Sequence, residues 1–175
     1  IYVIYQAGRD RERLRLQDIV QSQARILETL ARFNQTYTVY PEGPEAASLL
    51  QFSESERAFA RRGLGTTGEI ALARRESDDI VFLFRQRGAK IDQPLSIPMN
   101  SALAEPMRAA LTGQSGSMIG KDYDGTVVLA AYEPVRVLTL GLIAKIDLAE
   151  VRGRFTEAVI PLFFISVITV FGASA

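Results

Sequence analysis

Residues 113–147 read GQSGSMIGKDYDGTVVLAAYEPVRVLTLGLIAKID, and this stretch decides the fold. It contains three apolar, strand-like segments: Ser115–Gly120, Thr126–Glu133 and Leu138–Ile146. The first turn, KDYDG, has two aspartates that bond to their own backbone and a glycine that tolerates positive φ. Pro134 cannot donate a ladder hydrogen bond, so it marks the end of the second segment. Segments this apolar predict the middle of an antiparallel sheet that is covered on both faces.

Two further strands, Glu69–Arg75 and Asp79–Arg87, precede this stretch and predict a hairpin. Side chains alternate between the two faces of a strand. The second strand of the hairpin therefore has one face with Ile80, Phe82 and Phe84 and another with Val81, Leu83, Arg85 and Arg87. In the last strand Thr139, Gly141, Ile143 and Lys145 share a face, over which Gly141 is expected to open space.

A long helix is predicted before the sheet, over Arg9 to Phe33, because this segment is rich in helix formers and lacks Gly and Pro. Leu16, Val20 and Leu27 form one row of apolar residues along it. The series Ile19-Gln23-Ile26-Leu30-Phe33 steps by four and three, which is the spacing of a coiled-coil seam. This series would pack on the sheet or face a second subunit, and both can hold.

A second helix is expected from Ser101, as its N-cap, to about Leu111, with a kink or restart at Pro106 and an end at Gly113. Residues 88–100 carry two prolines and are expected to form a loop. Residues 34–62 are irregular, with either a short helix over Ser55–Arg62 or a mobile loop. The Gly-rich residues 63–68 predict a loop entering a strand; a phosphate cradle is disfavoured because no Lys-Ser/Thr follows.

Both ends of the sequence are apolar. The chain starts at IYVIY without a Met, which we interpret as the last turn of a membrane helix in a fragment; a cloning scar or frayed end is the alternative. Residues 158–175, AVIPLFFISVITVFGASA, contain no charge and as a helix would span roughly 27 Å, close to a bilayer core. They predict a transmembrane helix, with a buried core helix as the alternative.

The composition excludes several classes of function. The 20 basic and 20 acidic residues balance, so the chain lacks the basic footprint of a nucleic-acid binder. The absence of Cys removes disulfides, thiolate catalysis and Cys-based metal sites. The absence of His removes the usual general base, metal ligand and pH switch. We therefore predict no catalytic residue, metal or cofactor in this segment, and no nucleic-acid partner.

Several strings in the sequence carry a family resemblance: GTTGEIALARR, DDIVFLF, AEPMRAALTGQSG, DYDG, VLAAYEPV and GLIAKIDLAE. Together, over roughly Gly63 to Glu150, they resemble the Cache-type extracytoplasmic sensor domains of bacterial membrane receptors. The resemblance implies an α+β fold with a PAS-like, five-stranded antiparallel sheet in the order 2-1-5-4-3. The long helix would cover one face, and the second helix the other. Such domains tend to carry a basic residue after the Tyr of the DYDG turn; Asp124 stands there in this chain, which weakens the case for a bound anion.

The resemblance also implies how the chain is organised. Residues 1–8 would end a first membrane helix, 9–34 form the long helix, 35–150 the sensor domain, and 151–175 the juxtamembrane segment and start of a second transmembrane helix. The receptor would lie in the bacterial inner membrane, with this domain in the periplasm, and would form a homodimer through the N-terminal helix. The cytoplasmic output module would be a histidine kinase of a two-component system or a nucleotide cyclase; diguanylate cyclase and chemoreceptor modules also occur.

Five residues converge if this fold is right: Arg85, Tyr123, Asp124, Tyr132 and Lys145. They are the predicted ligand-binding residues, because Arg, Lys and Tyr hydroxyls are suited to contacting a small polar molecule. In the alternative interpretation Arg85 and Lys145 pair with carboxylates at the rim of the sheet, and Asp122 and Asp124 only shape the turn. The carboxylates of Glu69 and Glu133 would serve hydrolysis only at a defined separation, which the sequence does not fix.

The predicted function is to sense an unidentified small molecule outside the cytoplasm and to pass the signal across the membrane. A structural or dimerisation module that binds no small molecule is the competing hypothesis. An enzyme is disfavoured by the missing His and Cys.

Overall fold

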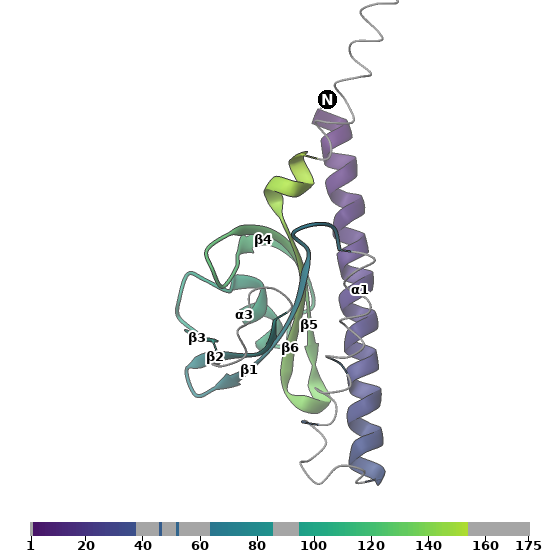
Figure 1. The fold of residues 1–175 in the computed structure, drawn as a ribbon, viewed down its shortest axis with the longest axis vertical. Helices are drawn as coiled ribbons and strands as arrows, with labels where there is room; N and C mark the ends of the chain where they lie inside the picture. Colours follow the sequence, from purple (N-terminus) through teal and green to yellow (C-terminus); the bar gives the residue numbers. More distant parts are fainter. Residues whose placement is uncertain (1, 38–45, 47–51, 53–63, 86–94, 154–175) are drawn as a thin grey trace, which may run out of the picture.

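The structure is a computed structural model that describes residues 2–37, 46, 52, 64–85 and 95–153 (Figure 1). Its elements are α1 (Tyr2–Tyr37), β1 (Glu69–Glu76), β2 (Asp79–Arg85), β3 (Leu95–Pro98), α3 (Glu105–Leu111), β4 (Gly116–Lys121), β5 (Val127–Val135), the 3-10 helix η1 (Arg136–Leu138) and β6 (Leu140–Asp147). Residues 148–153 are helical and follow β6 directly; we call them the exit helix. The predicted helix over 55–62, the predicted membrane span over 158–175 and Arg87 lie outside the described residues.

The sheet is antiparallel and has the order β3-β2-β1-β6-β5-β4. The predicted order 2-1-5-4-3 corresponds to β2-β1-β6-β5-β4 and is confirmed. The predicted number of five strands is wrong, because β3 adds a sixth strand beside β2, in a segment predicted to be a loop. Ile97 of β3 is buried and lies opposite Ile80. Pro98 is tolerated because it closes a short edge strand, where a missing N–H costs little.

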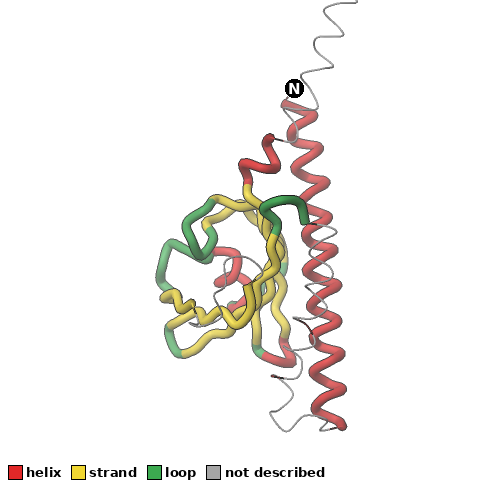
Figure 2. Tube along the Cα trace, viewed as in Figure 1, coloured by secondary structure: helices red, strands yellow, loops and turns green. Residues whose placement is uncertain are grey.

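Helix α1 covers one face of the sheet and is longer than the sheet itself (Figures 1 and 2). It is continuous from Tyr2, so the predicted boundary at residue 9 is no break in the helix. Leu16, Val20 and Leu27 are buried in the core between the helix and the sheet. The series with coiled-coil spacing is divided between two environments. Gln23 is 7% exposed and belongs to the packed face, whereas Ile26 and Phe33 are 43% and 53% exposed.

Helix α3 covers the other face, and Gly141 of β6 lies directly beneath it. A Cβ atom at Gly141 would lie 2.9 Å from the Sδ of Met107 and 3.1 Å from the Cβ of Ala110. The expectation that Gly141 opens a space is therefore wrong; the missing side chain lets α3 approach the sheet. The expected kink at Pro106 is also wrong, because α3 begins at Glu105 and places the proline in its first turn, where no N–H is needed.

The residue that precedes α3 is Ala104, with φ 53°, so Ser101 is not its N-cap. The hydroxyl of Ser101 instead accepts a hydrogen bond from the Leu103 N–H, 3.1 Å away. The end of α3 is as predicted, because Gly113 follows it with φ 84°.

A β-bulge in the β1–β2 hairpin changes which residues of β2 share a face. Leu72 lies opposite Phe84 and Ala73 opposite Phe82, so Leu83 is the extra residue. Phe84 consequently packs on the α1 side, while Ile80 and Phe82 pack on the α3 side. The prediction that Phe84 shares a face with Phe82 is wrong, because an extra residue reverses the alternation.

The β4–β5 connection is the predicted tight turn. The Asp124 carboxylate accepts a hydrogen bond from the Thr126 N–H at 2.9 Å, and Gly125 has φ 88°. Pro134 does not end β5, since the strand continues to Val135; Pro134 lies opposite Gly141 near the end of the ladder. The chain then passes through η1, so β6 starts at Leu140 and not at Leu138.

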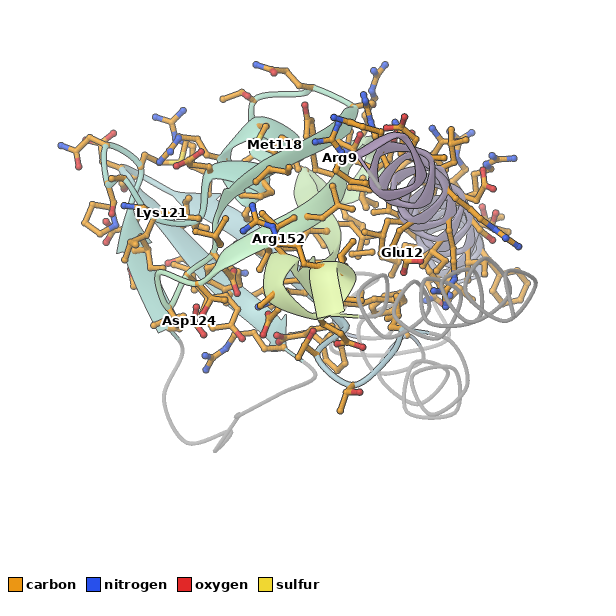
Figure 3. All side chains as sticks on the ribbon, turned by 90° about the horizontal axis from the view of Figure 1, so that it is seen from above. Arg9, Glu12, Met118, Lys121, Asp124 and Arg152 are labelled. Atoms are coloured by element: carbon orange, nitrogen blue, oxygen red, sulfur yellow. The ribbon has the colours of Figure 1, made fainter. Side chains whose placement is uncertain are left out.

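The described chain has both of its ends at one end of the long axis of the molecule. The N-terminus of α1 and the exit helix lie together there (Figure 1). Figure 3 looks onto this end and labels Arg9 of α1 and Arg152 of the exit helix. Among residues 2–37, 46, 52, 64–85 and 95–153, no helix has the length and apolar character needed to cross a membrane.

Candidate functional site

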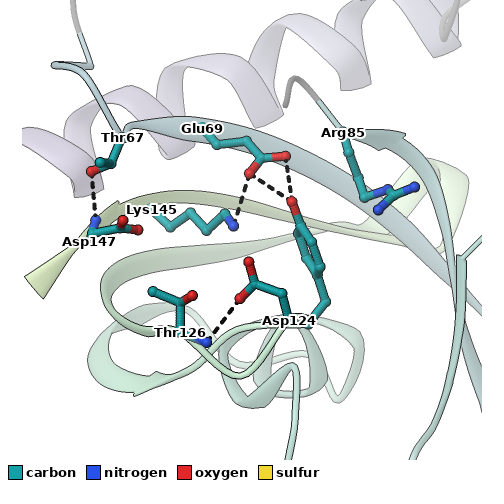
Figure 4. Close-up of a pocket in the computed structure, with 8 residues that line it drawn as sticks. Thr67, Glu69, Arg85, Asp124, Thr126, Lys145 and Asp147 are labelled. Atoms are coloured by element: carbon teal, nitrogen blue, oxygen red, sulfur yellow. Dashed lines mark hydrogen bonds and ion pairs between the residues drawn. The ribbon is translucent and has the colours of Figure 1, made fainter. Parts of the chain in front are cut away.

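The candidate site is a pocket on the α3 side of the sheet, where β1 starts and β6 ends (Figure 4). Glu69, the first residue of β1, lies opposite Lys145 of β6 in the ladder. The pocket has a volume of about 310 Å³ and is lined by Thr67, Glu69, Arg85, Tyr123, Asp124, Thr126, Lys145 and Asp147. These residues come from the 64–68 loop, three strands and the β4–β5 turn, so the fold assembles the pocket from distant parts of the sequence.

Three charged side chains form a buried triad: Glu69 and Lys145, which line the pocket, and Asp122, which is bonded to Lys145. Glu69, Asp122 and Lys145 are 1%, 1% and 5% exposed. The ammonium of Lys145 lies 2.9 Å from the Glu69 carboxylate and also forms an ion pair with the Asp122 carboxylate. Buried charges are costly unless they are paired. The single ammonium of Lys145 thus lies between the two carboxylates.

Tyr123 connects the triad to the open part of the pocket. Its hydroxyl lies 3.0 and 2.9 Å from the two carboxylate oxygens of Glu69 and donates to them. The Lys145 ammonium lies 4.2 Å from the centre of its ring, within range of a cation–π contact. Burial of the phenol, reinforced by the Glu69 charge, raises the pKa of Tyr123 well above its ordinary value. Tyr123 therefore remains a protonated hydrogen-bond donor at neutral pH.

Arg85 reaches the pocket because of the bulge in β2. Beyond Leu83 the alternation is reversed, which places Arg85, opposite Ala71, on the α3 side. The guanidinium carbon lies 5.3 Å from the centre of the Tyr123 ring. Arg85 is half-buried and lines the pocket, so its charge is available to a bound molecule.

The rim of the pocket is bonded to the exit helix. Thr67 accepts a hydrogen bond through its hydroxyl oxygen from the Asp147 N–H at 3.0 Å. The N–H groups of Thr66 and Thr67 donate to the Glu150 carboxylate at 2.9 and 2.6 Å. Gly68 permits this tight loop, because a Cβ atom there would lie 1.9 Å from the carbonyl oxygen of Leu64.

The structure brings together four of the five predicted residues: Arg85, Tyr123, Asp124 and Lys145 all line the pocket. Tyr132 does not. It is 8% exposed and packs in the apolar core on the α3 side with Ile143. Its hydroxyl lies under Gly116, where a Cβ atom would be 3.1 Å away.

Lys145 pairs with carboxylates, as in the alternative interpretation, but the pairing is buried and not at the rim of the sheet, and it includes Asp122, which that interpretation gave only a role in the turn. The sequence predicts neither of these partners, since Asp122 fits the turn without an ion pair and Glu69 has no fixed distance to another charge. A signal for Glu69 exists, because an acidic residue that opens an apolar strand and shares a face with Lys145 needs a charged partner. To recognise this from the sequence, one would have to know the register between β1 and β6, which places Glu69 opposite Lys145.

Glu69 and Glu133 do not form a pair of carboxylates. Glu133 lies opposite Leu142, and Glu69 lies opposite Lys145. Leu142 and Lys145 are three positions apart on β6, so the two glutamates are on opposite faces of the sheet. The Glu133 carboxylate instead accepts a hydrogen bond from the Ser115 hydroxyl at 2.9 Å.

Within the described residues, no group of three or more acidic side chains has the arrangement needed to hold a metal ion. Comparisons of the chain with protein-family models, curated proteins and solved structures give no match.

Proposed function

We propose that this chain is the Cache-type ligand-sensing domain of a bacterial inner-membrane receptor, and that it binds a small molecule in the pocket. The observation that carries this proposal is the bond between the pocket rim and the exit helix. Thr67 lines the pocket and also donates to Glu150, so a molecule in the pocket touches a residue that holds the exit helix. A sheet covered by α1 on one face and by α3 on the other supports the same proposal.

The last strand offers a direct path for the signal. Lys145 and Asp147 line the pocket, and the exit helix follows Asp147 without a loop. Leu148 and Val151 of the exit helix are buried in the core shared with α1. A displacement of the end of β6 would therefore be transmitted as a small piston or rotation of the exit helix.

Attachment to the membrane is supported by the position of the two ends. The N-terminus of α1 and the exit helix lie at the same end of the molecule (Figure 1). This arrangement suits a domain held between two membrane segments, with the apolar residues 158–175 as the second. The domain would then lie in the periplasm, and the output module, a histidine kinase or a nucleotide cyclase, in the cytoplasm.

A homodimer through α1 is the second part of the proposal. Ile26 and Phe33 are seven residues apart and 43% and 53% exposed. A spacing of seven keeps two side chains on one side of a helix that pairs with another. The same surface favours the competing function, a dimerisation module that binds no ligand. We propose no catalytic role, because the sequence contains neither Cys nor His.

A thermal-shift screen of the 175-residue chain against a library of small metabolites tests the proposal. The proposal expects a compound that raises Tm, and Arg85→Ala should abolish this shift. Arg75→Ala is the matched control, because Arg75 lies at the exposed end of β1, outside the pocket. The absence of any binding compound, together with a stable dimer, would establish the competing function.

A further inference from the structure

We infer that the β4 edge of the sheet rests on the membrane and contacts phospholipid headgroups. The contact surface consists of Ile119 and Lys121 of β4 and Val127 of β5, and we call it the β4 patch. This inference rests on the proposed attachment of the domain to the membrane, and it depends neither on the pocket nor on a ligand. It adds a lipid partner to the proposed function.

The three side chains of the β4 patch lie on one face of the sheet. Lys121 and Val127 are paired across the β4–β5 ladder, and Ile119 is two residues from Lys121, so it points to the same side. Ile119 and Val127 are 43% and 44% exposed, and no other large apolar side chain of the described strands is exposed. Leu129, which lies opposite Ile119, is buried in the core under α1. The β4 patch is therefore a part of this face that α1 leaves uncovered.

The β4 patch lies at the end of the molecule from which the exit helix leaves. Val128, next to the patch, is opposite Asp147, the last residue of β6 before the exit helix. Figure 1 shows β4 at the end of the sheet nearest the exit helix and the N-terminus of α1. Residues 154–157 separate the exit helix from the uncharged residues 158–175. Since a residue spans at most about 3.6 Å, the uncharged segment starts within roughly 18 Å of residue 153.

Helix α1 gives a second measure of the height of β4 above the membrane. The Nε of Arg13 donates to the Ser117 hydroxyl at 2.5 Å, so β4 lies beside residue 13 of the helix. The first charged residue of the chain, Arg9, is four residues earlier and therefore roughly 6 Å closer to the membrane along the helix axis. The headgroup layer on each side of a bilayer is about 5–7 Å thick. With residues 1–8 in the membrane and α1 upright, β4 is level with the headgroups.

The side chains of the β4 patch suit a phospholipid surface. Apolar side chains at such a surface bury area in the boundary between headgroups and acyl chains. Lys121 is exposed and has a flexible stem, so its ammonium can reach a lipid phosphate while Ile119 and Val127 lie deeper. Figure 3 looks onto this end of the molecule and labels Lys121 together with Arg9 of α1 and Arg152 of the exit helix. The two arginines place further positive charge at the headgroup level.

Acidic side chains also occur at this end, on α1 up to residue 15, in the β4–β5 turn and on the exit helix: Asp10, Glu12, Asp122, Asp124 and Glu150. Three of them are bonded within the molecule: Glu12 to Arg15, Asp122 to Lys145, and Glu150 to the 64–68 loop. Because charges of both signs are present, the apolar contact of Ile119 and Val127 holds the patch on the membrane, and Lys121 directs it to the phosphates.

The test measures whether the β4 patch lies in lipid or in water. The 175-residue chain, which contains no Cys, is reconstituted in nanodiscs of equal parts phosphatidylcholine and phosphatidylglycerol, with a nitroxide at Ile119→Cys or at Val127→Cys. Power-saturation electron paramagnetic resonance then compares collisions with oxygen, which enters lipid, and with a nickel chelate, which stays in water. Asp78→Cys is the control, because the Asp78 side chain is 98% exposed in the β1–β2 turn, away from the membrane end (Figure 1).

We expect the ratio of oxygen to chelate collisions to be several-fold higher at both patch positions than at Asp78→Cys. Adding Lys121→Glu to the chain labelled at Ile119→Cys should lower this ratio, because a carboxylate is repelled by lipid phosphates. Two independent label positions protect against a local distortion at one of them.

A ratio at both patch positions equal to that of the control would place the patch in water and overturn the inference, while the attachment to the membrane stands. Labels shielded from both reagents would show that a protein surface covers the patch, and this would also overturn it. If the chain does not enter the nanodiscs at all, the proposed attachment fails together with this inference.

Discussion

Thr67, which lines the pocket, is hydrogen-bonded to Glu150 of the exit helix. The Thr67 N–H donates to a Glu150 carboxylate oxygen at 2.6 Å, and the neighbouring Thr66 N–H donates to the other oxygen at 2.9 Å. One carboxylate thus holds two backbone N–H groups of the 64–68 loop. The loop lines the pocket through Thr67, so the contact joins the site to the segment that leaves the sheet.

Replacing Glu150 should release the exit helix. Glu150→Ala removes charge-assisted bonds to two N–H groups, and we expect a loss of about 1.5–3 kcal/mol in the free energy of unfolding. Urea denaturation measures the loss, and hydrogen exchange should show faster exchange at Thr66 and Thr67. Glu150→Gln keeps one acceptor oxygen and replaces the other with an NH2 donor, so it should recover only part of the loss. Unchanged exchange at both threonines would contradict the role of Glu150.

The buried triad should depend strongly on its single cation. Lys145→Met removes the ammonium that the buried carboxylates of Glu69 and Asp122 share, and we expect a loss of about 3–5 kcal/mol in the free energy of unfolding. Lys121→Met is the matched control, because Lys121 is also on a strand but exposed, and it should change stability by less than about 0.5 kcal/mol. Equal effects of the two substitutions would show that the triad contributes nothing to stability.

Tyr123 should make the stability of the domain depend on alkaline pH. Burial and the Glu69 charge raise its pKa in the folded state above the value of about 10 for an unfolded chain. The folded state therefore holds the phenolic proton more tightly. The resulting stabilisation is fully present below about pH 10 and is lost as the pH rises through the folded pKa.

Urea denaturation of the chain and of Tyr123→Phe between pH 8 and pH 11 tests this dependence. We expect Phe to cost about 1–3 kcal/mol at pH 8, because Glu69 loses a buried donor. Above about pH 10 the difference should shrink, because only the chain with Tyr123 loses stability from this phenol. A constant difference over the whole range would contradict the raised pKa.

The exposed side of α1 should form a contact between two subunits. These 175 residues contain no Cys, so single Cys substitutions report on the chosen position once any Cys elsewhere in the receptor has been replaced by Ser. Placed at successive positions from Gln17 to Glu28 in the full-length receptor in membranes, they should crosslink with a period of three to four residues. The largest amount of crosslinked product is expected at Ile26. Little product is expected at Val20, because its side chain is buried. Uniform or absent crosslinking would refute the dimer.

The central part of the sheet could be predicted because its strands are long, apolar and separated by clear turns. β3 could not, since four residues with a proline at one end give little signal, and its burial depends on pairing with Ile80. Which residues of β2 share a face also could not be predicted. Nothing in the sequence marks Leu83 as the bulged residue, and the bulge alone decides that Arg85 faces the pocket.

The sequence marks some residues of the candidate site and not others. Arg85 and Lys145 were recognisable because each interrupts an apolar strand. Asp122 was not, because its neighbours in the turn explain an aspartate equally well without a buried ion pair. Tyr132 was misplaced because a tyrosine on an apolar strand fits a core position as well as a pocket wall, and only the packing of β4 against it separates the two.

Movement of the exit helix on binding is the most direct test of the sensing account. Nitroxide labels at Ala149→Cys on the exit helix and Gln21→Cys on α1 would occupy exposed positions of the chain. Labelled chain diluted with unlabelled chain gives the intramolecular distance by pulsed electron paramagnetic resonance. The account predicts a shift on the order of 1–2 Å with a bound compound whose binding requires Arg85, and no shift in Arg85→Ala. Identical distance distributions with and without the bound compound would contradict it.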